Sequence, residues 1–215
     1  MGTAWIAVES LYSMDGDRAP ISDLAMIAGR DGNALLVDEA HATGVFGRDG
    51  RGLAEGLDGL PNVIVLRTCG KALGCEGALV CCPRLVRDFL VNRGRAFIFS
   101  TAPSPLMAVA VREALRILSD EPERRERLHA LIGHAETALG LAGVRATGSQ
   151  ILPLIIGDDN AAMRMAGQLQ AYGFDVRGIR PPTVPPGTAR LRISLTLNAT
   201  PNDVSALADA LAEIR

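Results

Sequence analysis

A lysine and an aspartate in two short segments are the residues of this chain best suited to chemistry. Lys71 lies in segment 68–74 (TCGKALG), and Asp38 directly follows the apolar run 34–37 (ALLV). A lysine among small residues in a turn can bring its amine close to a bound aldehyde. A carboxylate at the end of a buried strand can keep a ring nitrogen protonated. Pyridoxal phosphate requires these two groups of a protein, so we expect it as the cofactor.

Neighbouring polar residues allow more than one interpretation. Thr68 follows the apolar run 62–66 and could donate its hydroxyl to a phosphate oxygen, or it could simply form a turn. Asp38, Glu39 and His41 together could bind a metal ion, or they could cap a strand end that faces water. No second cluster of histidines, cysteines or acids supplies further ligands, so we predict no metal site. Lys71 alone could equally be a surface residue or a phosphate contact.

Three further places offer polar groups. Ser13 lies in segment 13–17 (SMDGD), which lacks the spacing of a calcium loop and by itself indicates a turn. Ser100 and Thr101 follow the run 96–99 and would place two hydroxyls at another strand end. Arg192 alternates with apolar residues in segment 190–194, which is typical of a half-exposed strand or of a clamp for a carboxylate.

The elements that must position these residues alternate along the first half of the chain. Short apolar runs predict strands at 4–8, 34–37, 62–66, 78–82 and 96–100, and amphipathic segments predict helices at 20–30 and from Pro83. This alternation is typical of an α/β layer with a mostly parallel sheet. We therefore predict a large domain at residues 1–119.

The second half has a different character. Segments 106–118 and 124–141 predict two successive long helices, followed by a strand at 151–156 and a helix at 161–172. Strands are predicted at 176–179 and 190–195, and a last helix follows Thr200. We predict a smaller α+β domain at residues 120–215.

Composition excludes several classes of protein. With 215 residues, 48% of them hydrophobic and 21% charged, the chain has the composition of a globular protein, and its net charge of -2 gives no reason to expect nucleic acid or a membrane as partner. No apolar run approaches the roughly 20 residues of a membrane span. The four cysteines, all within residues 69–82, fit neither a disulfide framework nor a zinc knuckle, so we expect reduced thiols in the cytoplasm.

The order of these segments is more specific than any one of them. Segments 13–17, 37–44 (VDEAHATG), 68–74, 99–101 and 180–185 (RPPTVP) occur in the same order as in the α-oxoamine synthases, and the chain resembles that family over almost its whole length. These are fold-type-I pyridoxal-phosphate enzymes that condense an amino acid with an acyl thioester and release carbon dioxide. The resemblance implies a transferase with a shared site in a homodimer.

The tail of the chain points to one branch of this family. Segments 179–185 and 190–196 are most similar to the branch that condenses L-alanine with a pimeloyl thioester, pimeloyl-CoA or pimeloyl-acyl-carrier protein, in biotin biosynthesis. The alternatives are branches of the 5-aminolevulinate synthase or 2-amino-3-ketobutyrate CoA ligase type, which use another amino acid and thioester.

The resemblance also implies a role for each catalytic and cofactor-binding residue. Lys71 would bind the cofactor covalently and later act as the base. Asp38 would keep the pyridine nitrogen protonated, His41 and Ser13 would bond the phenolic oxygen, and Thr68 would bind the phosphate.

Further residues would complete the site. Ser100 and Thr101 would reach the cofactor phosphate of the neighbouring subunit. Arg192 would bind the carboxylate of the amino acid, and Thr183 would contact substrate.

Relatives of this type carry a long N-terminal part, with a glycine-containing turn for the phosphate and a histidine that stacks on the cofactor. Nothing before Trp5 can supply either feature. We therefore expect the chain to correspond to the C-terminal portion, with part of the large domain and the whole small domain. A non-catalytic remnant that acts only by association is the alternative.

Overall fold

A computed structural model describes residues 4–30 and 32–214 of the chain. These residues group into two compact units. The first unit holds the chain up to Leu11 and Arg18–Pro122, and the second holds Tyr12–Asp17 and Glu123–Arg215. The second unit is therefore built from two stretches that lie far apart in the sequence.

The first unit contains a four-stranded sheet in the order β1-β2-β3-β4. Strands β1 to β3 are parallel, whereas β4 runs antiparallel to β3, so the sheet is mostly parallel. The strands are β1 (Trp5–Glu9), β2 (Ala34–Asp38), β3 (Val63–Thr68) and β4 (Ala78–Cys81). Together with the helices this confirms the predicted α/β class.

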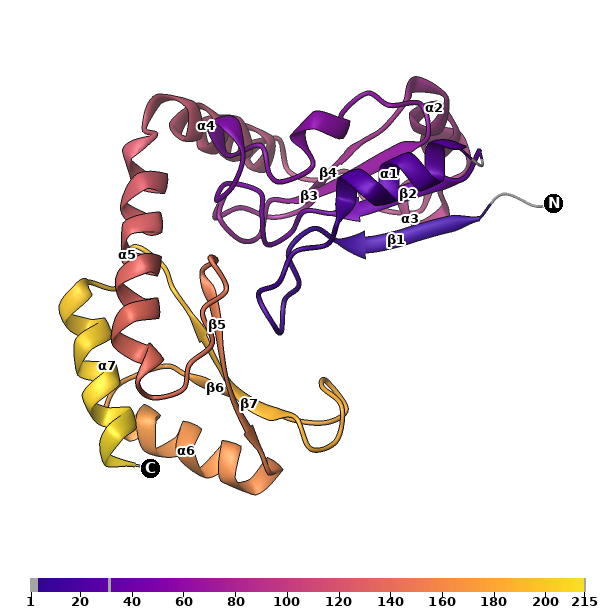
Figure 1. Cartoon of the computed structure of the whole chain (residues 1–215). Coiled ribbons are helices and arrows are strands. Elements are labelled where there is room, and N and C mark those ends of the chain that lie inside the picture. Colours follow the sequence, from indigo (N-terminus) through magenta and orange to yellow (C-terminus); the bar gives the residue numbers. More distant parts are fainter. Residues whose placement is uncertain (1–3, 31, 215) are drawn as a thin grey trace. The chain divides into compact units, whose positions relative to one another are not determined.

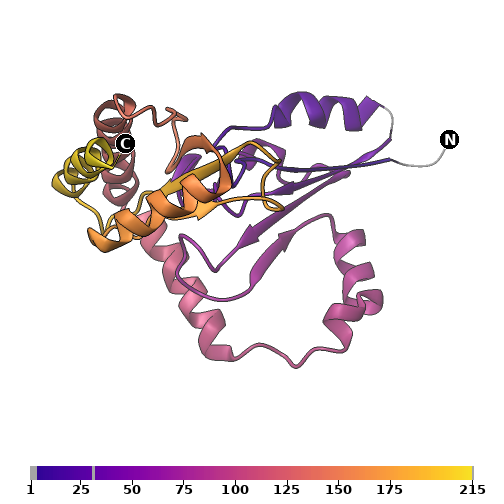
Figure 2. The same ribbon diagram turned by 90° about the horizontal axis from the view of Figure 1, so that it is seen from below.

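Helices lie on both sides of this sheet. Figure 2 shows α1 on one side and helices α2 and α4 on the other. The helices are α1 (Ile21–Arg30), α2 (Arg84–Arg93), α3 (Arg95–Ile98) and α4 (Pro105–Asp120), and two short 3-10 turns, η1 (Arg48–Gly50) and η2 (Glu55–Leu57), lie between β2 and β3.

The core of the first unit lies between α1 and the sheet. Ile21 and Ala28 of α1 pack with alternate residues of β2 and β3, including Leu35, Val37 and Val65. Alternate side chains of a strand point to the same face, which explains why the buried positions follow a period of two.

The predicted strand at 96–100 is wrong. Residues 95–98 form the short helix α3, in which the Ile98 amide donates to the Gly94 carbonyl at 2.9 Å. Phe97 and Phe99 are 65% and 74% exposed, so this apolar run is not a buried strand. A short apolar run without alternation does not distinguish a strand from a helical turn. Ser100 and Thr101 therefore follow a helix and do not end a strand.

The second unit contains an antiparallel three-stranded sheet in the order β5-β7-β6, with helices α5 and α7 packed against each other and α6 packed on the strands (Figure 1). Its elements are α5 (Glu123–Gly140), β5 (Ile151–Gly157), α6 (Asp159–Ala171), β6 (Arg177–Ile179), β7 (Ala189–Ser194) and α7 (Pro201–Glu213).

Leucines dominate the core of this unit. Leu139, Leu152, Leu169, Leu191 and Leu211 are fully buried in one cluster. Burial of one such side chain contributes roughly 1.5–3 kcal/mol, so this cluster stabilises the unit strongly. The order of strands and helices agrees with the predicted α+β pattern, whereas the division of the chain at residues 119 and 120 stays a prediction.

Among the helices of the described part of the chain, none has the length and apolar character that a membrane crossing requires.

Candidate functional site

The carboxyl ends of β2 and β3 bring several of the predicted residues to one edge of the first sheet. Asp38 is in register with Leu66 of the parallel strand β3, two residues before Thr68. The Asp38 carboxylate accepts a hydrogen bond from the Ala40 amide at 2.8 Å, which fixes its orientation at the start of the following turn. His41, half-buried, lies in that turn. Ligands of α/β proteins collect at such an edge.

The segment after β3 is a hydrogen-bonded loop that presents Lys71. The Gly70 amide donates to the Thr68 hydroxyl at 3.3 Å, and the Gly74 amide donates to the Lys71 carbonyl at 3.0 Å. The Cys75 amide donates to the Cys69 carbonyl at 2.8 Å and closes the loop. Lys71 itself is exposed. The backbone thus holds the lysine in a turn while its side chain stays accessible.

The two loops of this edge are in direct contact. A Cβ atom on Gly44 would lie 2.6 Å from the Cβ of Ala72, the residue after Lys71. Gly44 has a φ of +81°, and its amide donates to the Gly50 carbonyl at 2.7 Å. Only a residue without a side chain fits this conformation and this approach. The structure therefore brings the loop after Asp38, with His41, against the loop that carries Lys71.

Glu39 has a structural role. It is fully buried, and its carboxylate accepts hydrogen bonds from the amides of Leu53 and Ala54 at 2.9 and 2.7 Å. Burial raises the pKa of Glu39 above its ordinary value, although the two amide donors and the Arg67 charge act in the opposite direction. Both carboxylate oxygens of Glu39 accept these backbone hydrogen bonds, so the side chain stabilises the loop that follows β2.

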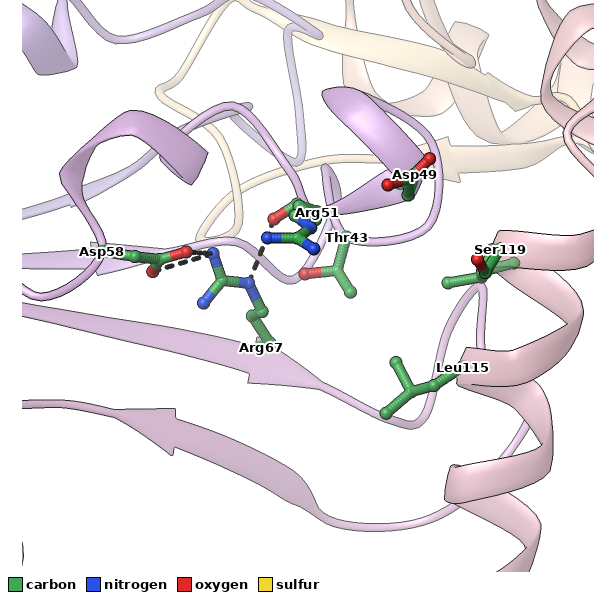
Figure 3. Close-up of a pocket in the computed structure, with 9 residues that line it drawn as sticks. Thr43, Asp49, Arg51, Asp58, Arg67, Leu115 and Ser119 are labelled. Atoms are coloured by element: carbon green, nitrogen blue, oxygen red, sulfur yellow. Dashed lines mark hydrogen bonds and ion pairs between the residues drawn. The ribbon is translucent and has the colours of Figure 1, made fainter.

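Residues of this loop, including Thr43 and Arg51, line a cavity of about 250 Å³ (Figure 3). The Arg67 side chain is largely buried there, and it donates to the Asp58 carboxylate at 3.1 Å and to the Arg51 carbonyl at 3.1 Å. Leu115 and Ser119 of α4 form the opposite wall. Asp58 already balances the charge of Arg67, so this arginine fixes the loop and offers little attraction to an anion.

Two other predicted residues meet in the second unit. Arg192 of β7 donates from Nε to the Ser13 carbonyl at 2.6 Å and from Nη1 to the Ser194 hydroxyl at 3.0 Å. Beside it, buried Arg190 donates to the Asp15 carboxylate at 2.5 Å. The segment Tyr12–Asp17 is therefore attached to β7, and Ser13 lies next to the arginine that we predicted as a carboxylate clamp.

The remaining predicted residues are exposed. Ser100 and Thr101 lie in the connection between α3 and α4, and Thr183 lies in the loop between β6 and β7. The Thr183 amide donates to the Arg180 carbonyl at 3.1 Å, so this loop has a defined turn. Their predicted roles stay predictions.

Gly44, Arg67 and the pair of Arg190 and Asp15 hold the structure together but were not predicted from the sequence. Gly44 is the last residue of the polar segment 37–44, and a glycine at this place is the local signal that could have indicated a close backbone approach. The Arg190 pair joins residues 175 positions apart, and no local pattern reveals such a contact.

Comparison with known proteins shows the family to which the chain belongs. Residues 1–211 match the family model of the aminotransferases of class I and II. The chain belongs to this family. Over 218 residues it is 44% identical to an 8-amino-7-oxononanoate synthase of Bordetella petrii, and the match covers 99% of the chain and 55% of that relative. The chain thus spans about half the length of the curated relative that it matches.

Solved structures of the same fold agree with the class I and II assignment and confirm the predicted fold-type-I architecture. A serine palmitoyltransferase of S. paucimobilis, solved with bound pyridoxal phosphate and myriocin, superposes with a TM-score of 0.89 at 28% identity, over 98% of the chain and 54% of its own. An 8-amino-7-oxononanoate synthase of Francisella tularensis superposes with a TM-score of 0.83 at 26% identity, over 99% of the chain and 63% of its own.

Proposed function

We propose that this chain takes part in the condensation of L-alanine with a pimeloyl thioester to give 8-amino-7-oxononanoate, carbon dioxide and the free thiol. The observation that carries the proposal is the contact between Gly44 and Ala72, which packs the loop after Asp38 against the loop that carries Lys71. The 44% identity to a named synthase of this type supports the choice of substrates.

The residues at the edge of the first sheet fit pyridoxal phosphate as cofactor. They supply an accessible amine, an oriented carboxylate, an imidazole and a hydroxyl in the side chains of Lys71, Asp38, His41 and Thr68. A covalent anchor, a proton for the ring nitrogen and donors for the phenolic and phosphate oxygens are the groups that this cofactor needs. A Cβ atom added to Gly74 would meet no atom within 4 Å, so space is open beside the backbone of the loop that carries Lys71.

When bound, pyridoxal phosphate would supply an electron-accepting ring beside the Cα atom of the amino acid. Asp38 would hold a proton on the ring nitrogen. His41 and Ser13 would donate to the phenolic oxygen, and Thr68 would donate to the phosphate. The Lys71 amine would bind the cofactor and, when released, would take the proton from Cα.

Arg192 would orient the substrate in this scheme. Its guanidinium can bind a carboxylate with two parallel hydrogen bonds, which would hold the amino acid until carbon dioxide leaves. The bond from its Nε atom to the Ser13 carbonyl would fix the direction of the side chain. Thr183 would contact substrate, and Ser100 and Thr101 would bind the phosphate in a second subunit of a cytoplasmic homodimer.

Borohydride trapping tests the proposal. The purified chain is incubated with pyridoxal phosphate, reduced with borohydride and digested, and the peptide masses are measured by mass spectrometry. We expect the label on Lys71, and we expect it to be lost in Lys71→Ala but kept in the control variant Glu76→Gln, which changes an exposed side chain near the same loop. Absence of any label at saturating cofactor would contradict the proposal.

The substrate is tested separately on cofactor-loaded protein. L-alanine, glycine and L-serine are added in turn, and the absorption spectrum of the cofactor is followed. We expect a change with L-alanine, whereas a response to glycine alone would favour the 5-aminolevulinate synthase or 2-amino-3-ketobutyrate CoA ligase type.

A further inference from the structure

Two cysteines enclose the loop that carries Lys71. Cys69 and Cys75 are joined by the hydrogen bond from the Cys75 amide to the Cys69 carbonyl, at 2.8 Å. Such a bond holds two Cα atoms within about 4.5–6.5 Å of each other. A disulfide requires roughly 4.4–6.8 Å between its Cα atoms, so the backbone already meets this condition.

The thiols of both residues are free. Cys69 is almost fully buried, whereas Cys75 is half-buried and its Sγ atom donates to the Leu73 carbonyl at 3.2 Å. Burial raises the pKa of the Cys69 thiol, and the neighbouring Cys75 raises it further. Cys75 is the more accessible thiol and would meet an oxidant first.

The other two cysteines of the chain have a different geometry. Cys81 is in register with Val65 at the end of β4, and Cys82 follows it directly. Successive residues of an extended strand point to opposite faces, which disfavours a bond between these two thiols. They serve as internal controls for any reaction at Cys69 and Cys75.

We propose that Cys69 and Cys75 form a reversible disulfide that closes the loop around Lys71. With hydrogen peroxide as oxidant, the Cys75 thiolate attacks one peroxide oxygen, the O–O bond breaks, and the departing hydroxide leaves as water with the thiol proton. The Cys69 sulfur then attacks the Cys75 sulfur, the S–O bond breaks and a second water leaves. Two thiols lose two electrons and two protons, and one peroxide becomes two waters.

The disulfide would restrict the loop. Gly70 and Gly74 flank Lys71, and glycine gives this segment considerable conformational freedom in the unfolded chain. Closing a seven-residue ring removes much of this freedom. The expected effect on cofactor attachment to Lys71 rests on the proposed function, whereas the disulfide itself does not.

Trypsin offers a direct test. Cleavage after Arg67 and Lys71 places Cys69 in peptide 68–71 and Cys75 in peptide 72–84. After treatment with peroxide and digestion without reductant, we expect these two peptides to be joined, and we expect dithiothreitol to separate them. Cys75→Ser should abolish the link, whereas Cys81→Ser and Cys82→Ser should keep it. A link that persists in Cys75→Ser, or modified thiols without a link, would overturn the proposal.

A second measurement tests the effect on Lys71. Borohydride trapping of pyridoxal phosphate is compared between the reduced and the oxidised protein, with Cys75→Ser as control. We expect trapping on Lys71 to be several-fold slower after oxidation and unchanged in the variant. Equal trapping in both states would refute the restriction of the loop. Absence of trapping even in the reduced protein would contradict the proposed function. The disulfide would still be tested independently by the mass of the joined peptides.

Discussion

Asp38 and Glu39 are adjacent carboxylates with opposite surroundings. Asp38 is half-buried at the end of β2, and its carboxylate is oriented by one backbone amide. Glu39 points into the protein and receives the amides of Leu53 and Ala54. Successive residues of an extended chain point to opposite sides, which separates a residue available for chemistry from one that holds the loop.

The raised pKa of Glu39 predicts a pH-dependent stability. A carboxyl group whose pKa is higher in the folded state contributes most at low pH, and its contribution declines as the pH rises from its ordinary value of 4.5 through the raised value. We expect the free energy of unfolding of the wild type to fall relative to that of Glu39→Gln across this range. Urea titrations at several pH values measure the difference.

The exposed Glu126→Gln of α5 is the control for this series, and its stability should run parallel to that of the wild type. Equal pH slopes for the wild type and Glu39→Gln would contradict the assignment of the raised pKa to Glu39.

At the scale of elements, the strands set the edge and the loops make the site. The parallel register of β2 and β3 places Asp38 and Thr68 at one edge, and the close approach of Gly44 to Ala72 joins the loops that follow. The buried side chains of Arg67 and Glu39 also hold the loop after β2 through hydrogen bonds to its backbone. The geometry of the edge therefore depends on glycine as much as on the polar residues.

Substitution of Gly44 tests this dependence. Gly44→Ala would meet Ala72 and would force a Cβ atom into a left-handed conformation, so we expect a loss of at least about 1–2 kcal/mol in the free energy of unfolding. We also expect weaker trapping of pyridoxal phosphate on Lys71. Chemical denaturation and borohydride trapping measure the two effects.

Gly133 provides the matched control. It lies inside α5, and an added methyl group there would meet no atom within 4 Å, so Gly133→Ala should raise stability by about 0.5–1 kcal/mol and leave trapping unchanged. Stability losses of similar size in both variants would argue against a special role for Gly44.

At the scale of the whole molecule, the two units differ in how much of their apolar surface is buried. The second unit buries its leucines in one cluster, whereas α2, α3 and α4 of the first unit have no buried residue. The exposed apolar side chains of these helices include Leu85, Phe89, Phe97 and Leu106, and Phe99 directly follows α3; all five are between 64% and 82% exposed. Apolar surface of this extent favours association.

We expect the chain to self-associate with increasing concentration through this surface. The double variant Leu85→Lys and Phe89→Lys should shift sedimentation velocity profiles toward the monomer, because it places charge on α2. Leu141→Lys is the control, since Leu141 is an isolated exposed leucine of the second unit and its loss should change little. Identical association of all three proteins would show that α2 does not contribute.

Local patterns predicted most of the elements. The apolar runs before Asp38 and Thr68 are strands β2 and β3, and helices α1, α4 and α5 begin and end close to their predicted limits. The run before Ser100 was misassigned because four apolar residues fit a helical turn and a strand equally well. The contacts of Gly44 with Ala72 and of Arg190 with Asp15 could not be predicted, because they depend on how distant loops fold back in space.

The contacts of segment Tyr12–Asp17 have a consequence for dissecting this protein. Arg190, Arg192 and the Ser149 hydroxyl all donate hydrogen bonds to this segment, although more than 130 residues separate it from them along the chain. A shortened protein that begins at residue 123 would keep all three strands of the second sheet and lose the acceptors of two arginines. The second unit can therefore be excised intact only as two pieces of polypeptide, and a designed short linker or separate peptide carrying residues 12–17 would have to restore the missing partner.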